Sequence, residues 1–319
     1  MRIAALLVVA TVAACGPSST TGPGAGRASG GSASDHTADG AVPRPTEPMS
    51  LDEARRYVLA LVNYDRAAHG LPAVTWDDTA AKAGQRQADD MAARGFTAHV
   101  GSDGSVPEVR YTESGGVGMV MENVGCFADA KSRALAKDAR FTAESLERVE
   151  KAFMDEVPPN DGHKRNILTA WHTTLGVGLA ATTEEPGIAC MAQEFVDDYG
   201  EYASLPARTK VGAKVNVSGR IRAPATIAGV GVSRVDTPKP RKPADLLKTH
   251  SYAIPKPFAI YFPKGFKTPI PVVVDGNGFS IDVPLSDGAK PGIYGVSVWA
   301  KHPATKDLVM ISLRTIFVE

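Results

Sequence analysis

A carboxylate and an imidazole lie seven residues apart across a single turn. Glu156 lies where one helix is predicted to end, and His163 lies where the next is predicted to begin. The segment between them, 158–162, is Pro-Pro-Asn-Asp-Gly, which does not continue a helix. His99 and Glu122 add an imidazole and a carboxylate upstream. Groups of these two kinds, brought together, can hold Zn²⁺ or a similar divalent ion, but no sequence spacing groups the four.

The elements that must position these groups follow from capping residues and apolar periodicity. Ser50 and Glu53 form a capping box before the first amphipathic helix, and Asp77 or Asp78 caps a second helix that Gly95 closes. The predicted helices cover residues 50–69, 78–94, 142–155 and 160–168, the predicted strands cover 175–181 and 187–196, and residues 101–119 are predicted to be loop.

Three motifs in this order resemble those of the CAP superfamily, the fold of plant pathogenesis-related proteins, cysteine-rich secretory proteins and venom antigens. They are a segment with His99, the pair Glu122-Asn123, and Gly-His-x-x-Asn-Ile-Leu at residues 162–168. Residues 61–72 and 74–81 also resemble the opening helices of bacterial members. The resemblance implies an α-β-α sandwich over residues 49–203.

The same resemblance implies a cavity lined by two histidines and two acids. Glu156 takes the place of the second acid because it follows Phe153 by three residues, as in eukaryotic members; many bacterial members have a small polar residue there. The implied metal ligands are His99, Glu122, Glu156 and His163. Asn123 and Asn166 are expected to support loops through backbone hydrogen bonds.

Three interpretations of these four residues stay open: a divalent metal site, a hydrogen-bonded brace of a loop-rich face, and a hydrolytic centre. The sequence has no HExxH pair and no GxSxG elbow, so binding is favoured over catalysis. The leading hypothesis is an envelope-anchored binding protein whose groove holds Zn²⁺ or another divalent metal, and also a small apolar ligand or lipid, as relatives that bind sterols and fatty acids suggest. The alternatives are a metal-dependent hydrolase of the cell envelope and an adhesive or spacer protein.

Length and composition describe a globular protein with room for two domains. The chain has 319 residues, 43% hydrophobic and 22% charged, with a formal net charge of zero. Such a balance gives no general basic field, so binding to nucleic acid is not expected.

The N-terminal sequence indicates a targeting signal. Arg2 precedes an apolar run too short to span a bilayer, and residues 12–15, Val-Ala-Ala-Cys, match the bacterial lipobox. The match implies a signal peptide at 1–14 and lipidation of Cys15, hence attachment to the bacterial envelope after secretion through the inner membrane, on the outer membrane in a two-membrane bacterium. An ordinary secretory signal is the alternative. Residues 15–48, rich in Gly, Ser, Thr, Ala and Pro, are predicted to be a disordered tether.

With Cys15 assigned to lipid, two cysteines remain, Cys126 and Cys190. In an oxidising compartment a disulfide is the simplest pairing, and two buried reduced thiols are the alternative.

The last third of the chain has a different composition. Short β-prone runs separated by Gly, Pro and Asp turns predict a β-sandwich of immunoglobulin-like type over residues 207–319. The seven runs are 211–221, 228–235, 258–262, 270–274, 279–283, 293–300 and 308–318. Residues 239–242, with two lysines, are interpreted as solvated loop. The overall fold class is therefore α+β.

Overall fold

The structure is a computed structural model that describes residues 13–14, 42–184, 189–249 and 251–319. The predicted signal peptide, apart from residues 13–14, lies outside the described residues, as do Cys15 and the tether up to residue 41. Residues 13–14 form a short strand β1 antiparallel to β10 (Tyr252–Ala253). Farther along the segment expected to be a tether, Arg44 forms an ion pair with Glu147, with 2.8 Å between Nε and Oε1.

The two long helices of the first domain begin and end where their capping residues predict. Helix α1 (Leu51–Ala68) starts with the capping box of Ser50 and Glu53. Helix α2 (Asp78–Arg94) starts at Asp77, whose side chain accepts a hydrogen bond from the Ala80 amide. It ends at Gly95, whose φ of 65° is a left-handed conformation suited to glycine. Both helices confirm the sequence prediction.

A four-stranded sheet forms the middle layer of this domain, in the order β2-β4-β5-β3. Its strands are β2 (Thr75–Trp76), β3 (Met119–Gly125), β4 (Thr174–Ala181) and β5 (Ala189–Asp197). Helix α2 lies very close to the sheet because glycines meet there: a Cβ on Gly178 would come within 2.1 Å of the Gly84 backbone. Small residues on this face of α2 therefore permit close packing against the sheet.

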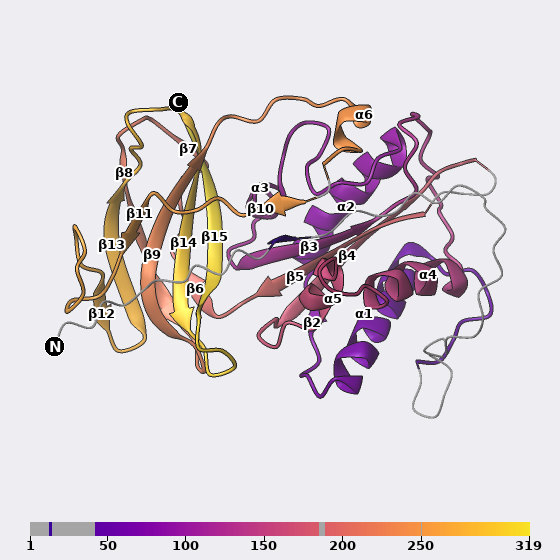
Figure 1. The fold of residues 1–319 in the computed structure, drawn as a ribbon, viewed down its shortest axis with the longest axis horizontal. Coiled ribbons are helices and arrows are strands. Elements are labelled where there is room, and N and C mark those ends of the chain that lie inside the picture. Colours follow the sequence, from indigo (N-terminus) through magenta and orange to yellow (C-terminus); the bar gives the residue numbers. More distant parts are fainter. Residues whose placement is uncertain (1–12, 15–41, 185–188, 250) are drawn as a thin grey trace.

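Helices cover both faces of the sheet (Figure 1). Leu61 of α1 and Phe153 of α4 (Ala143–Met154) share one apolar cluster with Leu175. Met91 of α2 belongs to a second apolar cluster with Ala180. Ala180 lies on the face of β4 opposite to that of Leu175. The expected α-β-α sandwich is confirmed, as is the short helix α5 (Gly162–Ile167).

The loop predicted for residues 101–119 is wrong over part of its length. Residues 107–113 form helix α3 (Pro107–Glu113), and β3 begins at Met119. Pro107 sits at the start of α3, where its missing N–H is not needed, and Tyr111 is buried. A seven-residue helix is too short to show a repeated apolar period, which is why periodicity missed it.

All seven β-prone runs of the last third become strands, and they form two sheets packed around one apolar core. One sheet has the order β12-β13-β8-β6 and the other β11-β9-β14-β15-β7. The strands are β6 (Gly200–Tyr202), β7 (Arg208–Thr209), β8 (Lys214–Ile221), β9 (Thr226–Val235), β11 (Ala259–Tyr261), β12 (Val273–Asp275), β13 (Gly278–Pro284), β14 (Gly292–Lys301) and β15 (Leu308–Val318). Strands β8, β13 and β12 stand as B, E and D of an immunoglobulin sandwich, with β9, β14 and β15 as C, F and G.

The two domains contact each other directly. Strand β6 follows the first domain without a linker and pairs with β8 of the sandwich. The Leu313 amide of β15 donates to the Gly118 carbonyl oxygen at 3.2 Å, and the Ser312 hydroxyl donates to that of Val117 at 2.5 Å. Tyr199 belongs to the sandwich core.

The predicted disulfide joins Cys126 to Cys190, with 4.3 Å between the Cα atoms. It links the end of β3 to β5, two paired strands.

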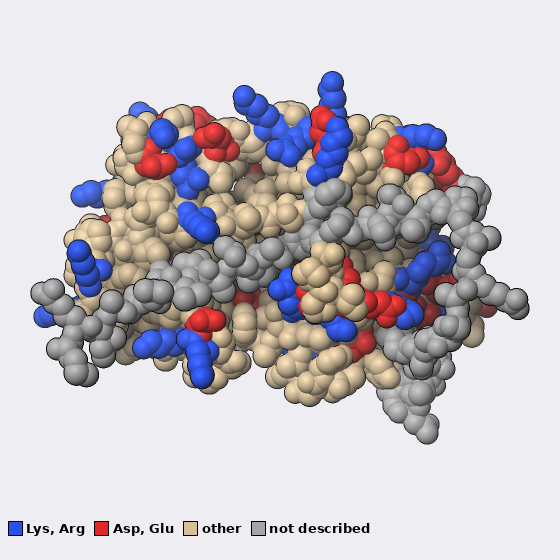
Figure 2. All heavy atoms as spheres, viewed as in Figure 1, with Lys and Arg blue, Asp and Glu red and all other residues tan. Residues whose placement is uncertain are grey.

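Lys and Arg are interspersed with Asp and Glu over the face shown in Figure 2, in keeping with the zero net charge. Within the described residues, no helix combines the length and apolar character needed to cross a bilayer.

Candidate functional site

The predicted site residues gather around β3, the edge strand of the first domain's sheet. Glu122 and Asn123 follow one another on this strand, so their side chains point to opposite faces. His99 approaches Glu122 on one face, and the backbone of His163 approaches Asn123 on the other. The structure therefore assembles two pairs of residues on either side of an edge strand.

His99 is held by Glu122 and, through it, by a buried arginine. Nδ1 of His99 lies 2.9 Å from Oε1 of Glu122, and Nη2 of Arg110 lies 2.7 Å from Oε2 of the same carboxylate. The Arg110 guanidinium also donates to the carbonyl oxygens of His99, at 3.1 Å, and Ser105, at 3.0 Å. All three ionisable side chains are buried. Arg110 thus fixes both the carboxylate and the loop that carries the imidazole.

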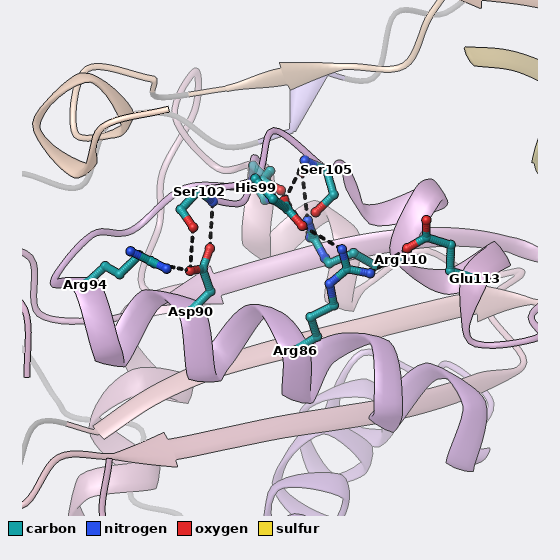
Figure 3. Close-up of polar contacts among 9 residues, drawn as sticks. Arg86, Asp90, Arg94, His99, Ser102, Ser105, Arg110 and Glu113 are labelled. Carbon is teal, nitrogen blue, oxygen red and sulfur yellow. Dashed lines mark hydrogen bonds and ion pairs between the residues drawn. The ribbon is translucent and has the colours of Figure 1, made fainter. Parts of the chain in front are cut away.

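Helix α2 holds the rest of that loop, as Figure 3 shows. The Asp90 carboxylate accepts hydrogen bonds from the amide of Ser102 at 2.6 Å and from its hydroxyl at 2.7 Å. Arg86 reaches from the same helix to Asp103 and to Glu113 of α3. These contacts hold the segment after His99 against α2.

Buried carboxylates outnumber buried cations around His99. Glu122 faces Glu194 across the β3–β5 pairing, and Glu108 of α3 is also buried. Burial alone would raise the pKa of Glu122, but the charge of Arg110 and the His99 hydrogen bond together lower it. Burial and then the charge of Glu122 raise the pKa of Glu194 well above its usual range. The surroundings therefore favour the charged form of Glu122 and the neutral form of Glu194.

The second pair spans the turn between α4 and α5. Oε1 of Glu156 lies 2.5 Å from Nδ1 of His163, and Oε2 accepts the His163 backbone amide at 2.8 Å. The Phe153 ring packs on the imidazole with 4.4 Å between ring centroids. Glu156, the acid assigned by its distance from Phe153, is thus in contact with His163, and it also satisfies an amide at the start of α5.

The Nε2 atoms of both imidazoles are buried, and neither has a hydrogen-bond partner within the part of the chain that the structure describes. The same part contains no group of three or more His, Cys, Asp or Glu residues placed to hold one metal ion. The four predicted residues consequently do not converge as four ligands. Each histidine instead has one nitrogen oriented by a carboxylate and one nitrogen free.

Asn123 and Asn166 are bonded to each other as well as to backbone. Nδ2 of Asn166 donates to Oδ1 of Asn123 at 2.9 Å and to the Met121 carbonyl at 3.3 Å. Nδ2 of Asn123 donates to the His163 carbonyl at 3.3 Å. Both side chains thus join β3 to α5.

This bonding continues in both directions through residues that the sequence analysis did not assign to the site. His172 bonds Asn166 through Nε2, at 2.9 Å, and Asp197 through Nδ1, at 2.6 Å. At the other end, Gln193 accepts from Asn123 and donates to Glu150. A signal for Glu150 was present in the sequence, because it falls between Leu146 and Phe153 on the apolar stripe of α4.

Two cavities differ in size and place. The cavity beside His99 encloses about 10 Å³ and is lined by His99, Pro107, Val120, Met121, Glu122, Tyr252 and Ile254. That is room for about one water molecule. The larger, of about 480 Å³, lies at the start of α1 among residues 135–140 and 179–181, away from both histidines.

The sequence of residues 59–193 matches the family described as the cysteine-rich secretory protein family, CAP. The match contains all three motifs and the sheet and helices that carry them. Residues 59–193 form a CAP domain. None of the curated proteins matches the chain.

Two solved structures similar to the chain come from bacteria. An extracellular protein containing an SCP domain from Bacillus anthracis is 18% identical with a TM-score of 0.35, over 48% of this chain and 45% of that protein. An outer surface protein from Borrelia burgdorferi is 16% identical with a TM-score of 0.34, over 47% of this chain and 97% of that protein. The chain thus spans less than half the length of the Bacillus anthracis protein.

Proposed function

We propose that the CAP domain is a binding module in which Nε2 of His99 and Nε2 of His163, one on each side of β3, bind divalent metal ions. The observation that supports this is the state of the two imidazoles: each Nδ1 contacts a carboxylate, and each Nε2 is buried without a partner among the described residues. A carboxylate that accepts from one ring nitrogen is the usual companion of a histidine whose other nitrogen binds metal. A buried imidazole nitrogen without a partner is otherwise unfavourable.

In this proposal the acids orient the ligands and are not ligands themselves. Glu122 and Glu156 each occupy the Nδ1 side of a ring, which differs from the four-ligand site that the family resemblance implied. An imidazole nitrogen suits Zn²⁺, with water or a bound partner completing the coordination of each ion. An ion held this way would act as a Lewis acid toward a group bound next to it.

Binding is proposed in preference to hydrolysis because His99 is covered. Tyr252 and Ile254 lie over it, and the space left beside it has room for about one water molecule. A hydrolase would need a substrate-sized opening at this place. The same limit means that an apolar ligand of fatty-acid size has no cavity beside His99 in this arrangement of the chain.

The test is a Zn²⁺ titration of the metal-free full chain, by calorimetry and by metal content after equilibrium dialysis. We expect Zn²⁺ to bind, and each of His99→Ala and His163→Ala to lose the ion that its own ring holds, because each ring has one Nε2 without a partner among the described residues. The matched control is His69→Ala, an exposed histidine at the end of α1. If both single variants bind as much Zn²⁺ as the wild type, the proposed histidine ligands are wrong.

We also infer that the mature chain is anchored to the bacterial envelope by lipid on Cys15. The lipobox at residues 12–15 supports this inference. Partition of the wild-type chain into detergent, and its shift to the aqueous phase in Cys15→Ser, would test it. Equal partition of the two chains would contradict it.

A further inference from the structure

One connection of the sandwich leaves its own domain and crosses the CAP domain. Strands β9 and β11 are antiparallel neighbours, with Ala259 opposite Val232. A hairpin loop would suffice to join them. Instead the strap, defined here as residues 236–257 and described except for residue 250, runs over α2 and returns (Figure 1). It carries α6 (Pro243–Leu246) and β10.

The strap first touches the loop that carries His99. The amide of Arg241 donates to the Ser102 carbonyl oxygen at 2.7 Å. Gly104 lies so close that a Cβ there would be 2.6 Å from the Lys239 carbonyl oxygen. The residues interpreted from sequence as solvated loop therefore include a backbone contact with the CAP domain.

A leucine anchors the middle of the strap. Leu246 has no exposed surface, while its neighbours in α6 are exposed or half-buried. It belongs to an apolar cluster of the CAP domain with Ala88 and Met91 of α2 and with Phe96. Leu246 is the one fully buried side chain among the strap's described residues, and the half-buried Leu247 packs against the same cluster, so Leu246 is the main aliphatic anchor at this point.

An aromatic residue forms the last anchor, directly above the candidate site. The Tyr252 hydroxyl donates a hydrogen bond to Oε1 of the buried Glu108. Tyr252 and Ile254 then line the small cavity that also contains His99 and Glu122. The strap thus closes the Glu122 face of the β3 edge.

We propose that this face of the CAP domain is a binding groove for a peptide with an aliphatic anchor and a tyrosine six residues after it, and that the strap is its resident occupant. The anchors are those of peptide recognition: a buried aliphatic side chain, a hydroxyl on a buried carboxylate and a backbone hydrogen bond. The groove walls belong to the CAP domain, and the strap's ends belong to two strands that pair without it. The strap is therefore displaced by a competing peptide without unfolding either domain, and its displacement uncovers His99. The proposal does not depend on metal binding.

The experiment uses a full chain in which a five-residue Asn-Gly-containing loop replaces residues 237–256. Binding of a fluorescent peptide with the sequence of residues 240–257 is followed by anisotropy. We expect the peptide to bind this variant at least about tenfold more tightly than the intact chain, where the strap competes as a tethered ligand. A control peptide with Leu246→Asp and Tyr252→Phe should lose at least about tenfold in affinity. Equal binding to both chains, or no binding to the folded variant, overturns the proposal.

A second measurement covers the case in which the loop replacement does not fold. Hydrogen exchange of the full chain is compared for Leu246→Asp and for Ala244→Asp, which places the same residue at an exposed position of the same turn. Amides of residues 99–105 should exchange at least about fivefold faster in the first variant and unchanged in the second. Equal rates in both variants would show that the strap is not a closed occupant of the groove.

Discussion

Nδ2 of Asn166 donates a hydrogen bond to Oδ1 of Asn123, over a distance of 2.9 Å. The two asparagines come from two separate family motifs, one on an edge strand and one on a short helix. They are the centre of a buried series of side chains that ends at Asp197 on one side and at Glu150 on the other. The series joins α5 and α4 to the sheet.

Replacing the centre of this series should cost stability. Asn166→Ala leaves His172 Nε2 and Asn123 Oδ1 without a partner, and each unsatisfied buried group costs about 1–3 kcal/mol. We therefore expect about 3 kcal/mol lower free energy of unfolding in denaturant titrations. Asn216→Ala is the control, because Asn216 is exposed on the sandwich. Similar losses in both variants would show that the buried bonds contribute nothing particular.

Glu150 should make the protein less stable as the pH rises. Burial, followed by the charge of Asp65, raises the pKa of Glu150 from 4.5 to about 8. The folded state then holds a proton that the unfolded state releases, so this stability is complete below about pH 4.5 and is lost as the pH rises through about 8. The Gln side chain of Glu150→Gln stays neutral at every pH. At pH 8 we therefore expect the free energy of unfolding of this variant to exceed that of the wild type by on the order of 3 kcal/mol.

The measurement is the free energy of unfolding from pH 5 to pH 8 for the wild type and this variant. The difference should grow steadily across that range. Glu144→Gln, on the same helix with a side chain that is 74% exposed, should follow the wild type at every pH. If the free energy of unfolding of the wild type and of Glu150→Gln depends on pH in the same way, ionising Glu150 in the folded protein does not reduce stability, and the prediction is wrong.

Arg110 should be far more important to stability than an exposed arginine. Arg110→Met leaves the ionised Glu122 buried without its cation, a kind of change that costs about 3–5 kcal/mol. Arg86→Met removes two ion pairs from a side chain that is 44% exposed, and it should cost less than about 1 kcal/mol.

The cost of Arg110→Met should also depend on pH. Arg110 lowers the pKa of Glu122 below that of a free glutamate, so its stabilisation is present above the unfolded pKa, near 4.5, and is lost as the pH falls below it. Thermal unfolding at pH 7 and pH 4 would measure this. A cost that is the same at both pH values would contradict the charge argument.

The disulfide should contribute through the unfolded state. Cys126 and Cys190 are 64 residues apart, and closing a loop of that length stabilises the fold by about 4 kcal/mol in the chain-entropy model. A reducing agent should lower the melting temperature of the wild type to that of Cys126→Ala with Cys190→Ala. The melting temperature of the double variant should not respond to the reducing agent. If the melting temperature of the wild type is also unchanged, the disulfide does not stabilise the fold through the unfolded state.

Local signals determined most of the secondary structure. The capping box at Ser50, the cap at Asp77 and the left-handed Gly95 act within a few residues, so the sequence alone places α1 and α2. The β-prone runs of the last third are equally local, because alternation and turn residues need no distant partner. Helix α3 was missed since seven residues do not display a period.

The sequence by itself pointed to His99, Glu122 and His163 through their motifs, and it left Cys190 as the available partner of Cys126. Only the tertiary structure decided how these groups meet. Alternation along β3 sends Glu122 and Asn123 to opposite faces, and His99 with Glu122 and His163 with Glu156 form two separate pairs. Only the structure brings Leu246 and Tyr252 onto the CAP domain, because contacts between residues 144 positions apart, such as that of Tyr252 with Glu108, depend on how whole domains pack and leave no local pattern in the chain.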